Sequence, residues 1–169
     1  MTSVWRKTQV APSFLAKASP SGDNVTEQAA GAFEGAGRYD DAVALFDELI
    51  AKTASAALYN ARCWVRAESG HNLEAALADC DAALKLMPGA SPYLDSRGFV
   101  ELRLGRFADA IRDYDAALAV YPDQAPSLFG RGVAELRQGD AQHGNADIAA
   151  AEHADAHVTT DFSRGGVTP

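Results

Sequence analysis

SPYLDSRGFVELRLGRFADAIRDYDAALAVYPDQ, residues 91–124, is the stretch of sequence that decides the fold. Its landmarks return at a fixed distance along the chain. Pro88 and Pro122 are 34 residues apart, and the Arg-Gly pairs that begin at Arg97 and Arg131 are separated by the same step. A repeat of this length is typical of a solenoid of stacked helical hairpins, and not of a globule built around one buried pocket. The period therefore favours binding of another protein over catalysis.

Each 34-residue unit has the features of two helices joined by a turn. In the clearest unit, Gly105 interrupts the chain between two halves that are rich in Ala and Leu, which are good helix formers. Ala110, Tyr114 and Ala117 recur at i, i+4 and i+7, which places them on one side of the second helix. Aligned on the same step, the four units are residues 23–56, 57–90, 91–124 and 125–158.

The pattern within each unit resembles the tetratricopeptide repeat. That motif has a Gly near the turn, a small residue early in the second helix, an aromatic or apolar residue four positions later, Ala three positions after that, and then Pro. The resemblance covers residues 23–158 and implies an all-α, right-handed solenoid of antiparallel helix pairs in one domain. The matching positions are Ala42, Ala76, Ala110 and Gly144, then Phe46, Cys80, Tyr114 and Ile148, and then Leu49, Ala83, Ala117 and Ala151.

The two ends of the chain lie outside the repeats. Residues 1–22 contain basic residues and no acid, and they predict a flexible tail; a transit peptide is an alternative interpretation. Trp5 and Phe14 lie in this tail, and we also considered that it docks in the groove of its own solenoid or of a second copy. Residues 159–169 are too short for a repeat and predict a C-terminal cap.

Composition excludes several classes of function. The net charge is −8 and the pI is about 4.9, so the surface repels phosphate backbones and nucleic acid is not an expected partner. No apolar run is long enough to span a bilayer and no secretory signal is present, which predicts a cytoplasmic protein. Cys63 and Cys80 fall on predicted core positions and are expected to be buried thiols. A disulfide between them is the less favoured alternative, because packed helices usually lie 8–10 Å apart.

Charged residues recur with the repeat and predict contacts between neighbouring hairpins. At two junctions, eighteen residues separate an Asp of the second helix from an Arg of the next first helix. The equivalent positions of the first junction, Leu45 and Cys63, are both apolar, as expected if the two positions are in contact. We therefore expect ion pairs between repeats. The two predicted pairs are Asp79 with Arg97 and Asp113 with Arg131.

Signals for chemistry are weak. His153 and His157 lie four residues apart, but two ligands alone do not define a metal site, and a solvated helix face is the favoured interpretation. We predict no catalytic residue, no metal and no cofactor.

The resemblance implies a concave groove lined by the first helix of each pair, where a partner peptide or helix binds. Apolar and basic residues at these positions suit a partner with apolar anchors and some acidic character. The predicted function is a non-enzymatic scaffold or adaptor that binds a protein partner. The alternatives are a self-associating structural protein, which would form a homo-oligomer, or a regulatory subunit; an enzyme is the least favoured. An alternative for the aromatic residues of this set, and for Phe99 above all, is that they pack between repeats. The predicted groove residues are Arg62, Val65, Phe99, Arg103, Phe129, Val133 and Arg137.

Overall fold

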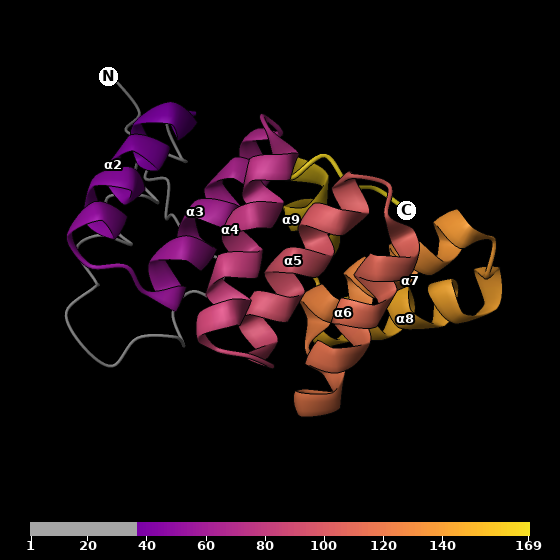
Figure 1. Ribbon diagram of the computed structural model, residues 1–169. Coiled ribbons are helices and arrows are strands. Elements are labelled where there is room, and N and C mark those ends of the chain that lie inside the picture. Colours follow the sequence, from indigo (N-terminus) through magenta and orange to yellow (C-terminus); the bar gives the residue numbers. More distant parts are fainter. Residues whose placement is uncertain (1–36) are drawn as a thin grey trace, which may run out of the picture.

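The computed structural model describes residues 37–169, and every regular element in that range is an α-helix (Figure 1). Successive helices pair as hairpins: α3 packs against α4, α5 against α6 and α7 against α8. The prediction of an all-α solenoid of antiparallel helix pairs is confirmed. The helices are α2 Tyr39–Lys52, α3 Ala56–Ser69, α4 Leu73–Leu86, α5 Ser91–Arg103, α6 Phe107–Val120, α7 Ala125–Gln138, α8 Ala141–Ala154 and α9 Val158–Arg164.

We call the first helix of each pair an A helix (α3, α5 and α7) and the second a B helix (α2, α4, α6 and α8). The A helices also pack on one another, α3 on α5 and α5 on α7. The predicted tail of residues 1–22, with Trp5 and Phe14, and the first helix of the first unit fall outside the described residues. The described chain therefore begins at the B helix of the first unit.

Local sequence fixes where the helices begin and end. The side-chain oxygens of Ser55 and Asn72 accept hydrogen bonds from backbone N–H groups in the first turns of α3 and α4. Both α5 and α7 carry Pro in their first turn, where a missing N–H costs no helical bond. Gly139 ends α7 with a φ of 90°, a left-handed conformation that Gly adopts without steric penalty.

Small residues let the two helices of a hairpin approach closely. Ala76 and Ala110 are fully buried where the B helices cross their partners. Where α7 crosses α8, a Cβ added at Gly132 would lie 2.7 Å from the carbonyl oxygen of Gly144. A side chain at either position would force the backbones apart, so both helices depend on Gly at this point.

Cys63 on α3 and Cys80 on α4 form a disulfide, so the expectation of two free thiols is wrong. Their Cα atoms are 5.5 Å apart. The separation of about 8–10 Å between packed helices is a distance between their axes, whereas a disulfide depends on the distance between two Cα atoms. Each Cα lies about 2.3 Å from its own axis, so facing Cα atoms lie several ångströms closer than the axes do. The bond closes the α3–α4 hairpin from inside the core.

Candidate functional site

The last helix does not stack as another repeat unit. Instead, α9 packs against α7 and α8, and the chain after it runs along the A helices (Figure 1). We call residues 158–168 the C-terminal segment. Val158 and Phe162 of this segment are buried. Phe162 reaches beyond the last hairpin and contacts Phe99 on α5, the A helix of the preceding repeat.

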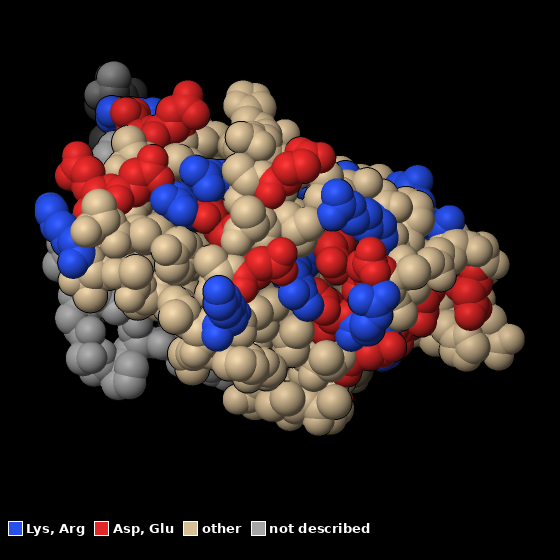
Figure 2. All heavy atoms as spheres, viewed as in Figure 1, with Lys and Arg blue, Asp and Glu red and all other residues tan. Residues whose placement is uncertain are grey.

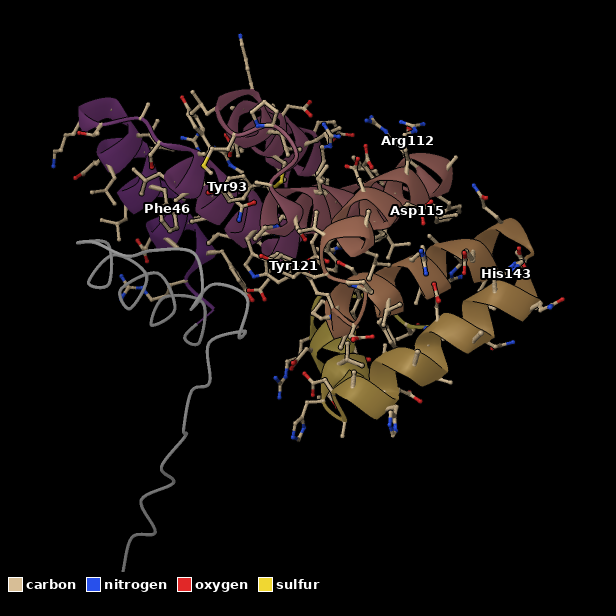
Figure 3. The ribbon with its side chains drawn as sticks, turned by 90° about the horizontal axis from the view of Figure 1, so that it is seen from below. Phe46, Tyr93, Arg112, Asp115, Tyr121 and His143 are labelled. Carbon is tan, nitrogen blue, oxygen red and sulfur yellow. A yellow bond between two sulfur atoms is a disulfide. The ribbon has the colours of Figure 1, made fainter. Side chains whose placement is uncertain are left out.

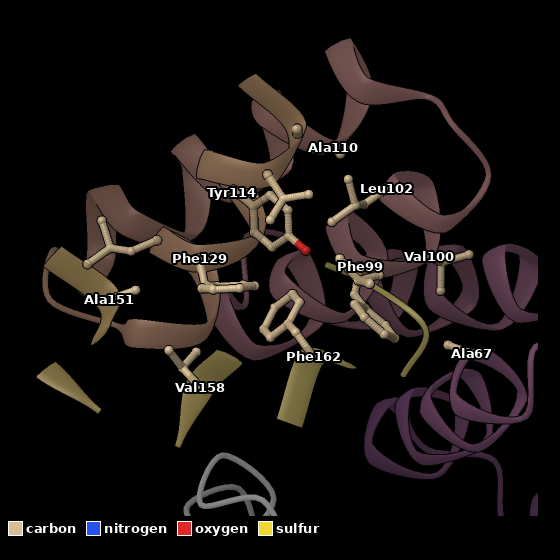
Figure 4. Packing of buried hydrophobic residues seen from close by; sticks show 14 of the residues in the cluster. Ala67, Phe99, Val100, Leu102, Ala110, Tyr114, Phe129, Ala151, Val158 and Phe162 are labelled. Atoms are coloured by element: carbon tan, nitrogen blue, oxygen red, sulfur yellow. The ribbon is translucent and has the colours of Figure 1, made fainter. Parts of the chain in front are cut away.

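Aromatic rings from different repeats meet beneath the C-terminal segment. The rings of Trp64 on α3 and Phe99 on α5 have centroids 5.0 Å apart. Phe162 packs edge-on against Phe99 at 5.5 Å and lies 4.8 Å from Phe129 of α7 (Figure 4). Such tilted and perpendicular pairs are the favoured geometries for aromatic side chains. The aromatic run therefore joins three A helices, and α9 supplies the ring that lies between the last two.

The predicted apolar groove residues are in the core rather than on an open surface. Phe99, Phe129 and Val133 belong to the main hydrophobic cluster together with Phe162. Val65 belongs to a separate cluster with Ala42 and Phe46, so it packs α3 against α2. Phe162, which lies outside the repeats, contacts both Phe99 and Phe129, and no repeat position specifies these contacts.

Two of the predicted groove cations contact the covered face. Arg103 donates a hydrogen bond to the carbonyl oxygen of Ala67, and its guanidinium carbon lies 6.0 Å from the centre of the Phe99 ring. Burial lowers the pKa of Arg103 from its ordinary value. Arg137 is exposed, and its Nη2 donates to the carbonyl oxygen of Thr168 at 3.1 Å. These two arginines and the residues Trp64, Phe99, Phe129 and Val133 form what we call the A-helix face.

A cavity of about 290 Å³ lies between the A-helix face and the end of the C-terminal segment. Apolar side chains and the two guanidinium groups share its wall, an arrangement suited to an apolar side chain next to a backbone carbonyl or carboxylate. The lining residues are Leu102, Arg103, Gly105, Phe107, Val133, Arg137, Gly166, Val167 and Thr168.

The third predicted groove cation, Arg62, instead belongs to a series of ion pairs that joins the hairpins. Arg97 shows the pattern best: it binds Asp113 of its own hairpin through two hydrogen bonds of 2.5 and 2.8 Å, and it binds Asp81 of the preceding hairpin at 2.9 Å. The hydrogen bond to Asp113 is the main reason that the pKa of Arg97 is raised. Arg131 repeats the pattern with Asp147 and Asp115. On the face seen in Figure 2, many basic side chains likewise lie directly beside acidic ones.

These contacts correct the predicted pairing of Asp79 with Arg97 and of Asp113 with Arg131. Arg62 and Arg66 of the same hairpin bind Asp79. Ion pairs between repeats do exist, but each joins an Arg to an Asp two positions after the predicted one. The first junction has such a pair as well, between Arg62 and Asp47, although its two compared positions are apolar. The signal was present in the sequence, because Asp47, Asp81 and Asp115 follow the 34-residue step.

Two further carboxyl groups in the described residues have raised pKa values. Asp95 is buried and accepts a hydrogen bond of 2.5 Å from the Ser127 hydroxyl, and burial raises its pKa to about 6. Burial also raises the pKa of Glu101 to about 7. Within residues 37–169, no group of three or more His, Cys, Asp or Glu side chains is arranged to hold a metal ion. None of the helices in that range is long and apolar enough to cross a membrane.

Comparison with known proteins agrees with the repeats and the fold. The family model of the tetratricopeptide repeat matches residues 28–93 and 98–159, so the chain belongs to the tetratricopeptide repeat family. Proteins of this family are protein-interaction modules and are typically non-catalytic scaffolds. Among curated proteins, none matches the sequence.

Solved structures share the architecture at low sequence identity. A thermophilic tetratricopeptide protein from Thermus thermophilus is 16% identical, with a TM-score of 0.69 over 85% of this chain and 84% of that one. MamA from Desulfovibrio magneticus, residues 41 to the end, is 18% identical, with a TM-score of 0.66 over 86% and 87%. A tetratricopeptide protein from Parabacteroides merdae is 17% identical, with a TM-score of 0.62 over 84% of this chain and 58% of that one.

Proposed function

We propose that this protein is a scaffold or adaptor that captures a segment of a partner protein on its A-helix face. One observation carries the proposal: this face already holds a stretch of polypeptide, the C-terminal segment, through an aromatic anchor and a hydrogen bond from Arg137 to a backbone carbonyl. Those are contacts that recognise peptides generally, because the side chain fills a pocket while the backbone satisfies a fixed donor.

The chemistry of the face limits the partner. The aromatic rings Phe99 and Phe129 need an apolar or aromatic side chain between them. Arg103 and Arg137 border the cavity and favour carbonyl oxygens or carboxylates in the same segment. A partner segment that combines an aromatic anchor with acidic neighbours therefore fits best.

Site-specific photo-cross-linking tests the proposal without altering the core. A photoreactive amino acid replaces exposed Arg137 of the face, which removes one hydrogen bond to the bound segment but keeps the aromatic anchor site. In a matched control it replaces Arg112 on the B helix α6, an arginine whose side chain is 72% exposed (Figure 3). In source lysate, we expect a defined partner to be cross-linked from position 137 and not from position 112. Cross-linking only from position 112 would move the binding surface to the B helices and refute the proposal.

Self-association is a second candidate function, and one observation favours it. Leu86 and Met87 end α4, and Val120 and Tyr121 stand at the equivalent positions 34 residues later at the end of α6; all four are 52–58% exposed. Exposed large apolar side chains that recur with the repeat are candidates for an interface between proteins. Replacing Met87 and Tyr121 by Glu should abolish any concentration-dependent mass in light scattering. A mass that stays constant with concentration in the unchanged protein would contradict self-association.

A further inference from the structure

The C-terminal segment is fitted closely to the A-helix face. Phe162 lies between the rings of Phe99 and Phe129. Three residues later, a Cβ added at Gly165 would lie 2.6 Å from Cζ of Phe99, so no larger residue can pass this point without a shift. Val167 is buried beyond it. The segment thus combines an aromatic anchor, a Gly at a close approach and a second apolar contact.

The same segment is poorly equipped to hold its structure alone. Its helix, α9, has only seven residues and no side-chain hydrogen bond at its N-cap. Isolated helices of this length are unstable in water, so the contacts with the A helices keep it folded. The family match ends at residue 159, which means that most of the segment lies outside the matched repeats. The pairs α3–α4, α5–α6 and α7–α8 pack directly on one another, so its release would leave these contacts in place and would uncover the A-helix face.

We propose that residues 158–168 are a built-in competitor for the partner, and that the partner displaces them with a segment of the same chemistry. This inference rests on the proposed function. The displacing segment carries an aromatic residue for the site of Phe162, followed three residues later by Gly, and a backbone carbonyl for Arg137. Because the competitor is tethered, its effective concentration is in the millimolar range, and a partner in trans binds only to the fraction of molecules in which the face is open.

A peptide in trans tests the inference with the full chain. The probe is a fluorescent peptide of residues 156–169, AHVTTDFSRGGVTP. Gly165→Ala should prevent the tethered segment from seating; its φ of −76° suits Ala, so the clash with Phe99 is the only change. Phe162→Ala is a second route to the same release. Ser163→Ala, on the exposed side of α9, is the matched control.

Fluorescence anisotropy should distinguish the variants in which the C-terminal segment is released from the proteins in which it remains seated. The peptide should bind Gly165→Ala and Phe162→Ala at least about ten times more tightly than it binds the unchanged protein or Ser163→Ala. A peptide in which Phe162 is replaced by Ala should bind none of them. Circular dichroism confirms that each variant is folded, and amide exchange across residues 158–168 reports release.

Three results would overturn the inference. The first is a folded, released variant that does not bind the peptide, and the second is equal binding by the unchanged protein. The third is slow amide exchange across residues 158–168 in both released variants. The cross-linking test separates this failure from that of the proposed function. A partner captured from position 137 while the peptide fails to bind leaves the function standing without a built-in competitor. Peptide binding without any captured partner would mean that the segment competes for the A-helix face but that the proposed function fails.

Discussion

Tyr114 offers the sharpest test of how the repeats pack. This fully buried side chain of α6 lies between two glycines, one on α5 and one on α7 (Figure 4). A Cβ added at Gly130 would lie 2.3 Å from Cζ of the ring, and one added at Gly98 would lie 3.1 Å from it. The ring therefore cannot move away from Gly130 without approaching Gly98. We predict that Gly130→Ala destabilises the protein because of Tyr114 alone.

Two opposing effects set the size of the change. Overpacking a core costs about 1–3 kcal/mol, and a 2.3 Å contact belongs at the upper end of that range. Ala is favoured over Gly inside a helix by about 1 kcal/mol. Gly130→Ala should therefore lower the free energy of unfolding by about 2 kcal/mol. In a Tyr114→Leu background, where the ring is absent, the same change should raise it by up to about 1 kcal/mol.

Urea unfolding at 25 °C, followed by far-UV circular dichroism, measures all four proteins of this double-mutant cycle. Tyr114→Leu destabilises the protein by itself, so the relevant quantity is the effect of Gly130→Ala within each background. The predicted coupling energy between the two substitutions is about 3 kcal/mol. Gly130→Ala should change from destabilising to stabilising when the Tyr114 ring is absent. An equal loss in both backgrounds would show that the ring does not restrict this position and would refute the reasoning. Comparable denaturant slopes across the cycle are required for the comparison to hold.

Three further predictions concern the disulfide and two kinds of carboxylate. Reduction of the Cys63–Cys80 bond, which spans 17 residues, should lower the free energy of unfolding by about 3 kcal/mol in urea melts with and without dithiothreitol; a variant with Ala at both positions should not respond to the reductant. The folded-state pKa of Asp95 is raised to about 6, so its ionisation favours the unfolded chain and removes stability as pH rises from about 4 to about 6. Asp95→Asn should therefore match the unchanged protein near pH 4 and exceed its stability above pH 6; a constant difference across that range would contradict this. Asp113→Asn leaves a partly buried guanidinium without its main partner and should cost about 3 kcal/mol in thermal or urea melts. Asp115→Asn, at a carboxylate whose side chain is 57% exposed, should cost less than about 1 kcal/mol; equal losses would refute the distinction.

The sequence by itself determined the helical hairpins and their order. The 34-residue step, the turn at Gly105 and the small residues at Ala76 and Ala110 each report on a position and its near neighbours. In a solenoid each repeat contacts only the adjacent repeats, so local patterns are enough to specify most of the fold. That is why the repeat pattern of a single chain is enough to predict the family and the architecture.

Other features were decided by the tertiary structure alone. Arg97 selects Asp113 and Asp81 rather than Asp79, because the crossing of the helices, and not the repeat step, sets which carboxylates it reaches. The Cys63–Cys80 bond depends in the same way on a Cα separation of 5.5 Å that spacing cannot supply.

The covered A-helix face shows most clearly what the sequence pattern cannot predict. Phe162 contacts Phe99 across 63 residues of sequence, and nothing in the repeat pattern refers to it. Periodicity encodes contacts that recur, whereas this contact occurs once and is formed by a segment outside the repeats. The sequence therefore determined the solenoid. Only the packing of a non-repeated segment decided that its A-helix face is occupied. The physical reason is that burial of apolar surface depends on where all parts of the chain meet in space.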